Sequence, residues 1–223
     1  NKQSLTTNSA FLTKPEQTTQ LDLGINWDAG TVSGSVSAFY ADIDDYILID
    51  KVTKGGGVTT VRNIDARSYG LEAGLAWRFA RNWQTDASLA WVHGRNRTDD
   101  TALAQQPPLE ARFGLNWDNG TWSAGALWRL VAAQNRIDPG KGNIVGQDLR
   151  TQGETSGFGV FSINGGYRMN KRVKITAGID NLFDKKYAEH LSKSGAAITG
   201  YEADTRVNEP GRTLWVKASL ALD

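Results

Sequence analysis

Residues 118–131 read DNGTWSAGALWRLV, and their side chains alternate between two chemical classes. Every second residue from Trp122 to Leu130 is apolar, and Trp128 lies near the far end of this series. The residues between them are mostly small or polar and include Arg129. An alternation with a period of two indicates a β-strand with one apolar and one polar face. The Asp-Asn-Gly at its start is typical of a tight hairpin turn, because Asn and Gly readily adopt positive φ.

The same alternation recurs along the chain and predicts nine strands. They span 18–27, 31–42, 66–79, 83–94, 109–117, 121–132, 158–169, 173–182 and 212–222. Short connections at 28–30, 80–82, 118–120 and 170–172 alternate with long ones around 43–65, 95–108, 133–157 and 183–211. This rhythm predicts an antiparallel up-and-down meander, whereas a Greek-key sandwich has no reason to keep it.

Charge is confined to one face of these strands. No charged residue falls on an apolar stripe, although 22% of the chain is charged. Lys or Arg on a lipid-facing stripe near the bilayer midplane costs about 2–4 kcal/mol, so the pattern favours a membrane barrel. A soluble sheet with one face in a core also predicts alternation and stays an alternative. The residues expected on the opposite, lumen-lining stripe are Asp22, Glu72, Arg78, Asp86, Glu110, Arg112, Arg129, Arg168, Lys174, Asp180 and Lys217.

Aromatic residues gather at both ends of the predicted strands. Those next to the short turns are Trp27, Phe79, Trp83, Trp117, Trp122 and Tyr167, and those near the long loops are Tyr40, Tyr69, Trp91 and Trp128. Two such belts are typical of the two membrane interfaces. A strand of about ten residues, tilted by about 45°, spans about 23 Å, which matches the apolar band of an outer-membrane barrel. The sequence therefore predicts an all-β, antiparallel up-and-down transmembrane β-barrel.

The strand count and the loop lengths predict the orientation and the extent of the barrel. In outer-membrane barrels the short turns face the periplasm and the long loops lie outside. The first and last strands then both run toward the periplasm, so we expect a periplasmic C-terminus. Bacterial single-chain barrels have an even strand number, and nine is odd. We therefore expect this chain to be part of a larger barrel, with residues 1–17 ending an extracellular loop.

Composition excludes several other classes of function. The 25 Lys and Arg residues nearly balance 24 Asp and Glu residues, so no basic excess indicates nucleic-acid binding. The chain has no cysteine, which excludes disulfides and thiolate metal sites. No apolar run of about 18 residues is available for a transmembrane helix.

Candidate chemical groups are few. His93 and His190 are the only histidines and have no partner at ligand spacing, so we expect interfacial or loop residues and no metal site. The acidic run 42–45 predicts a solvated loop, with calcium bridging to lipopolysaccharide as the alternative. The glycines 55–57 lack the setting of a phosphate-binding loop. We predict no catalytic residues and no cofactor.

Longer stretches resemble a known family, the TonB-dependent outer-membrane receptors. They are LTKPEQTTQLDLGINW (12–27), SAFYADIDDYI (37–47), NIDARSYGLEAGLAWRF (63–79), TAGIDNLFDKKYAEH (176–190) and NEPGRTLWVKASLAL (208–222). The continuous stretch 181–220 looks most like the copper receptor branch of this family. The motif residues are Asp180, Asn181, Leu182, Phe183, Asp184, Tyr187, Glu209, Pro210, Gly211 and Arg212, and we interpret them as architectural.

The resemblance implies a barrel of 22 strands with an N-terminal plug, of which residues 1–223 supply about the last nine strands. It implies a Gram-negative outer membrane, with lipid and lipopolysaccharide as surroundings. It also implies TonB as a partner through a plug that this chain does not contain. Members of the family usually end on an aromatic residue, whereas this chain ends ALALD, so we expect a trimmed C-terminus.

The function predicted from the resemblance is active uptake of a scarce substrate. Copper ion is favoured, and its ligands are expected in the plug and in earlier barrel segments. A siderophore or cobalamin receptor of the same family is the alternative. A passive porin, a barrel enzyme and a soluble adhesin or lectin remain the alternatives from other classes.

Overall fold

The computed structural model describes residues 13–52, 58–142, 153–192, 199–200 and 205–221. The glycines 55–57, most of the N-terminal segment 1–17 and the last two residues lie outside this part of the chain. The strands are β1 (Gln17–Asp28), β2 (Val32–Val52), β3 (Val58–Ala80), β4 (Trp83–Asn96), β5 (Thr101–Ala102), β6 (Glu110–Asp118), β7 (Trp122–Val131), β8 (Phe158–Arg168), β9 (Val173–Asp180) and β10 (Thr213–Leu220).

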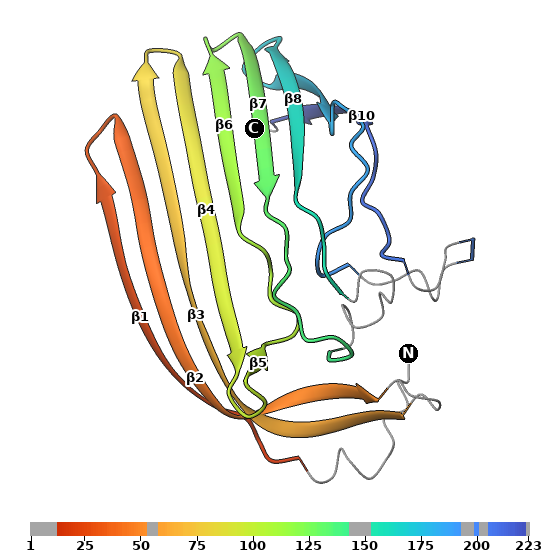
Figure 1. Cartoon of the computed structure of the whole chain (residues 1–223). Coiled ribbons are helices and arrows are strands. Elements are labelled where there is room, and N and C mark those ends of the chain that lie inside the picture. The colour runs from red at the N-terminus through yellow and green to blue at the C-terminus, as the bar shows by residue number, and fades with distance from the viewer. Residues whose placement is uncertain (1–12, 53–57, 143–152, 193–198, 201–204, 222–223) are drawn as a thin grey trace.

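All ten strands belong to one antiparallel sheet. Its order is β1-β2-β3-β4-β6-β7-β8-β9-β10, with the short β5 paired to β4. Figure 1 shows that the sheet is a single curved wall, in which neighbours in sequence are neighbours in space. In the described residues, no helix has the length and apolar character needed to cross a membrane. The wall is therefore a meander, as the alternating connections predict.

Short turns close one end of the wall, at the four predicted positions. Gly30 has a φ of 80°, and its amide donates to Asp28 Oδ1 at 2.8 Å. Gly120 repeats this arrangement with a φ of 92° and a bond to Asp118 Oδ1 at 2.6 Å. Both turns need positive φ, which glycine adopts without a steric penalty. The long connections all lie at the opposite end, which we call the long-connection end.

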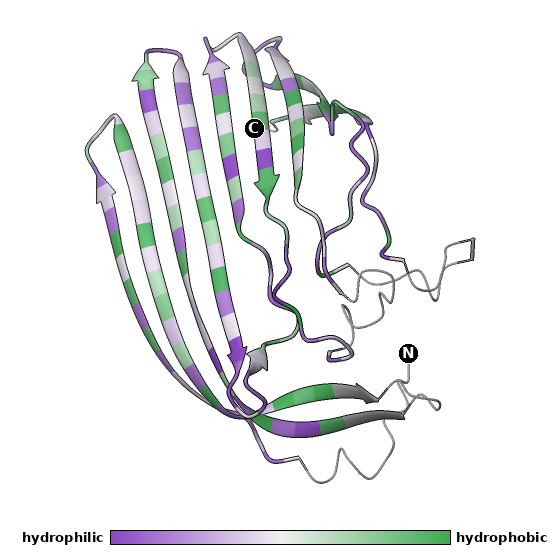
Figure 2. Cartoon of the chain, in the orientation of Figure 1, coloured by the Kyte–Doolittle hydropathy of each residue, from purple (hydrophilic) through white to green (hydrophobic). Residues whose placement is uncertain are grey.

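Strand register gathers the apolar stripes into one continuous face. Ile25 faces Val36, Leu115 faces Ala126, and Ile179 faces Leu214 across their strand pairs. The intervening residues form the second face, which we call the charged face. The strands in Figure 2 accordingly change colour from residue to residue. A one-residue slip would exchange the two faces, so the whole pattern specifies a single register.

The apolar face has no protein packed on it in the described structure. Leu75, Phe113 and Leu115 lie on central strands, yet they are 42%, 48% and 42% exposed. A soluble sheet would bury such residues in a core. Exposed apolar surface of this extent is typical of contact with a membrane or a partner. The described residues thus do not support the soluble adhesin or lectin alternative.

Aromatic side chains form rows at both ends of this face. At the short-turn end, the Trp83 ring lies 6.3 Å from Phe79 and 6.4 Å from Trp117. At the long-connection end, the Tyr69 ring lies 6.5 Å from Tyr40 and 5.8 Å from Trp91. The two rows bracket small and aliphatic side chains, which is the arrangement expected at two membrane interfaces.

The prediction of a long loop at 43–65 is wrong. β2 and β3 continue through this region, pairing from Tyr46 with Ile64 to Val52 with Val58. The acidic run that indicated a loop is instead a bulge between Ile43 and Tyr46, where Asp45 has a φ of 56°. The strands continue past the aromatic row because their outer parts bury a small apolar cluster of their own. The short β5 was also not predicted.

The buried clusters lie beyond the apolar band, at the long-connection end. The first contains Leu48, Ile64, Ala66, Leu103 and Ala104. The second contains Val131, Phe158 and Val160, with Tyr187 packed against it. Packing like that in the core of a soluble protein therefore holds the long connections, whereas the apolar face of the wall is exposed.

Candidate functional site

The predicted lumen residues occupy one face, but the structure brings only some of them together. Glu110, Arg112 and Arg129 meet near the long-connection end, where Arg112 pairs with Arg129 across β6 and β7. Asp86 accepts a bond from Asn116 at 2.9 Å. Arg168 pairs in register with Lys174 at the short-turn end. The others on this face, Asp22, Glu72, Arg78, Asp180 and Lys217, are spread along the wall.

Arg129 is the centre of a charged network that also contains Glu189. Its Nε donates to Glu110 Oε1 at 2.9 Å, and one terminal nitrogen donates to Glu110 Oε2 at 2.6 Å. The guanidinium also bonds both carboxylate oxygens of Glu189, from the connection after β9. Arg112 Nε donates to Glu110 Oε1 at 2.6 Å. Bidentate pairs of this kind fix geometry as well as charge, so Arg129 ties the β9–β10 connection to the wall.

A cavity of about 410 Å³ opens beside this network. It is lined by residues that include Glu72, Ser88, Pro108, Glu110 and Arg112. Its lining carries both signs of charge together with apolar atoms. This arrangement suits polar contacts with a neighbouring protein segment or a small ion rather than a large apolar ligand.

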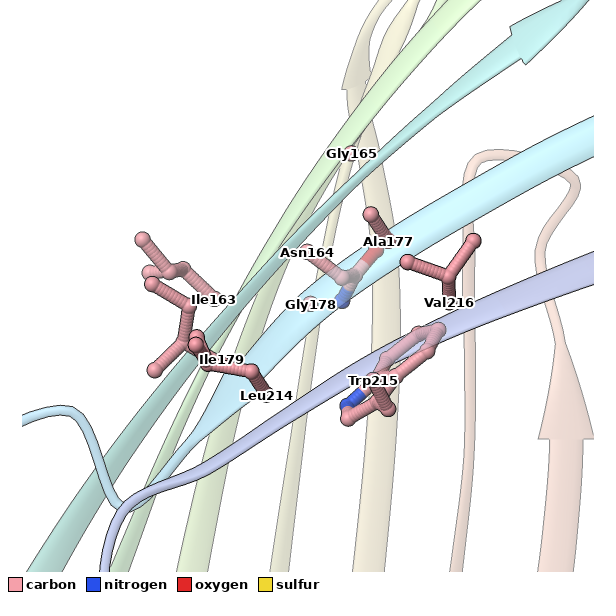
Figure 3. Close-up of a pocket in the computed structure, with 9 residues that line it drawn as sticks. All are labelled: Ile163, Asn164, Gly165, Ala177, Gly178, Ile179, Leu214, Trp215 and Val216. Atoms are coloured by element: carbon pink, nitrogen blue, oxygen red, sulfur yellow. The ribbon is translucent and has the colours of Figure 1, made fainter.

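A second hollow, on the opposite side of the wall, is apolar. Its volume is about 590 Å³, and it lies along β8, β9 and β10 (Figure 3). Ile163, Ile179, Leu214 and Val216 line it with side chains of the apolar face. Such a surface suits hydrocarbon and offers no ligands for an ion.

The first family motif folds around Asn181. This residue is 3% exposed and has a φ of 51°, a conformation that Asn tolerates better than most residues. Its side-chain oxygen accepts the Lys185 amide at 2.8 Å, and its nitrogen donates to Lys185 O at 2.9 Å and to Pro210 O at 3.4 Å. The Leu182 amide bonds Phe161 O at 2.8 Å, which continues the sheet pairing past Asp180.

The second motif lies against the first. Asp184 Oδ1 accepts the Arg212 amide at 2.8 Å, and a Cβ at Gly211 would lie 2.6 Å from that same oxygen. The Glu209 amide donates to Tyr187 O at 2.9 Å. Phe183 is 73% exposed and stacks 6.0 Å from Phe161. The ten motif residues therefore join the end of β9 to the start of β10, and none of these contacts forms a catalytic arrangement.

The two histidines have different surroundings. His93 lies at the long-connection end of the apolar face, 4.8 Å from the Tyr69 ring, with Nδ1 2.7 Å from Arg136. His190 is 2% exposed, and its Nδ1 lies 2.9 Å from Thr155 Oγ1. Among the described residues, no three His, Cys, Asp or Glu side chains come together as a metal site would require.

Arg206 lies beside His190 and joins two long connections. Its guanidinium is buried and donates to His190 O at 3.2 Å, to Glu154 O at 3.1 Å and to Gly153 O at 2.6 Å. Neither Arg206 nor Glu189 was predicted as a structural residue, because strand periodicity assigns no partners to residues in long connections. Burial, followed by the nearby Arg206 charge, lowers the pKa of His190 to about 4.

We expect this packing to loosen in acid. Above pH 6.5 His190 is neutral in the closed and the opened connection, so stability is complete there. As the pH falls from about 6.5 to about 4, His190 takes up a proton in the opened connection but stays neutral in the closed one. The free energy that favours the closed connection therefore decreases over this range. Hydrogen exchange at the Thr155 amide, corrected for intrinsic rates, should show protection falling up to about a hundredfold over this range. A His190→Gln receptor should show no such step, and an equal step in that variant would assign the effect to another group.

Residues 3–182 match the model of the TonB dependent receptor-like β-barrel. The ferric enterobactin receptor of Pseudomonas aeruginosa is 35% identical over 69 residues, which are 30% of this chain and 9% of that protein.

Solved structures match over nearly the whole chain. The copper transporter OprC has 48% identity and a TM-score of 0.88, covering 95% of this chain and 32% of that one. A mutant ferric enterobactin receptor from Pseudomonas aeruginosa has 21% identity and a TM-score of 0.69, covering 93% of this chain and 31% of its own. The ferric-catecholate import receptor Fiu from E. coli K12 has 19% identity and a TM-score of 0.66, with 93% and 28% covered. The last two show the fold alone.

The chain thus spans about a third of the length of the solved structures that it matches. The matches confirm the predicted all-β, antiparallel barrel architecture, here as a partial barrel. With a family model matched over 180 of its 223 residues, this chain belongs to the TonB-dependent receptor β-barrel family.

Proposed function

We propose that this chain is the C-terminal part of the barrel of a TonB-dependent receptor that takes up copper ion. The supporting observation is the 48% identity to the copper transporter OprC over 95% of the chain. The siderophore receptors fit the same fold with 19% to 21% identity. The family and the copper transporter together imply a Gram-negative outer membrane.

In this proposal the wall separates lipid from a polar lumen. The apolar face contacts lipid and lipopolysaccharide, and the charged face contacts a plug that belongs to the rest of the receptor. The balanced charges of Glu110, Arg112 and Arg129 suit ion pairs with such a plug better than an ion-selective open pore. The long connections are extracellular, the short turns are periplasmic, and TonB acts on the plug. The proposal contains no catalytic step.

The residues of this chain supply the wall and the mouth rather than the copper ligands. Imidazole is a good copper ligand, but both histidines are already engaged. His93 bonds Arg136, and His190 is buried beside Thr155. We therefore place the ligands in other segments of the receptor.

A siderophore receptor is the second candidate. The match to the ferric enterobactin receptor at 35% identity supports it, although that match covers 69 residues. A cobalamin receptor or a passive porin has no comparable observation in its favour.

Uptake by the full-length receptor distinguishes these functions. In copper-limited cells, we expect radioactive copper accumulation to fall to the same level when either the receptor or TonB is deleted. Calorimetry on the purified receptor should detect copper binding. No copper binding would remove the copper assignment, and binding of ferric enterobactin would favour the second candidate. Ion conductance in liposomes without an energised partner would instead indicate a porin.

A further inference from the structure

The outer part of the β2–β3 hairpin does not continue the wall. We define the hairpin stem as 46–52 and 58–64. At the bulge before Tyr46 the hairpin bends sharply, and Figure 1 shows the stem crossing the long-connection end of the sheet. A bulge of this kind bends a strand and re-aims everything beyond it. The stem therefore lies where cargo would enter the barrel.

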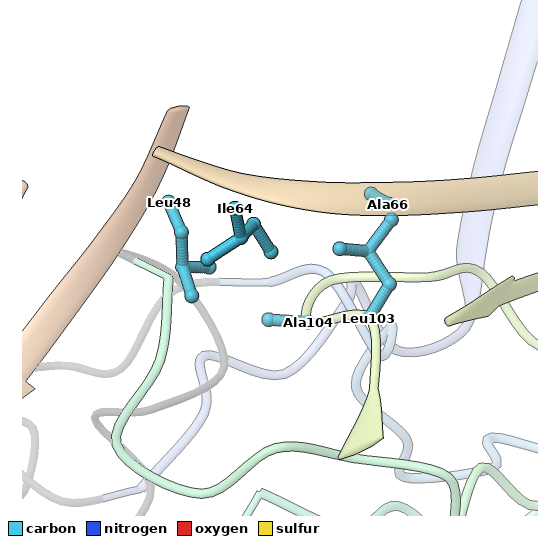
Figure 4. Packing of buried hydrophobic residues seen from close by; sticks show 5 residues of the cluster. All are labelled: Leu48, Ile64, Ala66, Leu103 and Ala104. Carbon is cyan, nitrogen blue, oxygen red and sulfur yellow. The ribbon is translucent and has the colours of Figure 1, made fainter. Parts of the chain in front are cut away.

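One face of the stem is packed like a soluble protein core. Leu48 and Ile64 are 3% and 2% exposed, and they lie against Leu103 and Ala104 of the connection after β4 (Figure 4). Neighbouring Ile47, on the other side of β2, is 42% exposed. Lifting the stem would expose this cluster to water, which opposes the movement.

Polar contacts hold the stem from three further directions. The Gly142 amide, from the connection after β7, donates to Ile49 O at 2.7 Å. Asn63 accepts the Lys14 amide at 2.7 Å and donates to Lys14 O at 3.0 Å. Arg62 forms an ion pair with Asp99, and this contact holds the pKa of the Asp99 carboxyl below its usual value. Three separate segments thus fix one hairpin.

We propose that the hairpin stem is a fixed cover that narrows the mouth of the barrel and selects small cargo. This inference rests on the proposed transport function, since a copper ion can pass an opening that is too narrow for a bulky metal complex. A movable lid would be held by few buried contacts, because it must break them in every transport cycle. The stem is instead held by a buried apolar cluster and by polar contacts to three other segments.

Hydrogen exchange of the full-length receptor without substrate tests whether the stem is fixed. The amides of Leu48, Arg62 and Ile64, which point into the β2–β3 ladder of the stem, should exchange within about tenfold of the β3 and β4 wall amides. Exchange at the rate of an unprotected loop would overturn the proposal. This measurement does not depend on what the receptor transports.

Cross-linking tests whether transport needs the stem to move. This chain has no cysteine, so Arg62→Cys with Asp99→Cys adds a defined pair that a reducible bifunctional thiol reagent can join. Copper uptake by the joined receptor should stay within about twofold of the reduced receptor, because a fixed cover does not open. The Arg62→Cys single variant treated with the same reagent is the control. Loss of uptake that reduction restores would show a moving lid and overturn the proposal.

Reagent size tests whether the stem narrows the mouth. A cysteine at Ser88, on the charged face, should react in intact cells with a small maleimide but not with a polymer-bearing maleimide. Adding Leu48→Asp should loosen the stem and raise labelling by the large reagent about tenfold or more, whereas Ile47→Asp should not. Equal labelling by both reagents without Leu48→Asp would overturn the proposal. If copper uptake is absent but the two reagents still differ in labelling, copper is not the cargo. The proposal that the stem is a fixed cover is then kept.

Discussion

Replacing Ala126 by arginine lowers the free energy of unfolding of the receptor in lipid bilayers by about 2–4 kcal/mol. Ala126 lies on the apolar face, between Leu115 of β6 and Ile163 of β8. It stands near the middle of β7, between the aromatic residues Trp122 and Trp128. A guanidinium there must leave water and has no partner among the neighbouring apolar side chains. The measurement is equilibrium unfolding by guanidinium chloride in reconstituted liposomes.

The matched control is Leu127→Arg in the same strand. Leu127 lies next to Ala126 but on the charged face, opposite Gly114 and Ser162. A guanidinium there points to the side that already holds Arg129, so we expect a loss below about 1 kcal/mol. Equal losses at the two positions would mean that both faces have the same polarity. That result would contradict the assignment of the apolar face to lipid.

Periodicity predicted the wall well because each strand shows the alternation of apolar and polar residues within its own sequence. In the opening segment, side-chain polarity alone places Trp122 and Arg129 on opposite faces, and the neighbouring strands repeat the pattern in register. The turns were equally visible, since Gly30 and Gly120 occupy positions that need positive φ. Period-two alternation and turn chemistry are local properties, so a single sequence contains them.

The long-connection end could not be predicted in this way. Leu48 and Leu103 belong to one cluster although more than fifty residues separate them, and no local pattern links them. The acidic run was interpreted as a loop because three aspartates interrupt the alternation, yet Asp42 is held by Arg67 at 3.0 Å and the strand continues. Contacts between distant connections depend on how the wall curves, which the strand pattern does not specify.

The motif residues lie between these two cases. The resemblance indicated that Asn181, Asp184 and Gly211 matter, but it did not say what they contact. The structure shows two of them in bonds across the β9–β10 connection, to Pro210 and to the Arg212 amide. Glu189 follows the first motif closely and was not singled out, although it forms the ion pair that fixes this connection to the wall.

That ion pair leads to the second large effect, which is the loss of Arg129. Arg129→Leu should lower the free energy of unfolding by about 2–4 kcal/mol, somewhat less than the loss for a fully buried pair. The Arg129 side chain is 21% exposed, and Glu110 and Glu189 are 21% and 31% exposed. Removing the guanidinium takes away the cation that bonds both carboxylates, and leaves Glu110 paired with the more exposed Arg112. Unfolding in liposomes measures the loss, and hydrogen exchange at the Glu209 amide reports whether the β9–β10 connection has been released.

Arg112→Leu is the control that separates charge from position. Arg112 bonds the same Glu110 from within β6, but its side chain is 54% exposed, and the ion pair with Glu189 belongs to Arg129. Exposed ion pairs contribute about 0–1 kcal/mol, so Arg112→Leu should have a small effect and leave the Glu209 amide protected. A double-mutant cycle between Arg129→Leu and Glu189→Gln should give a coupling energy of about 1 kcal/mol or more. If the two losses simply add, Arg129 does not act through Glu189, and the β9–β10 connection is held by its other contacts, such as the bonds of Asn181, Asp184 and Arg206.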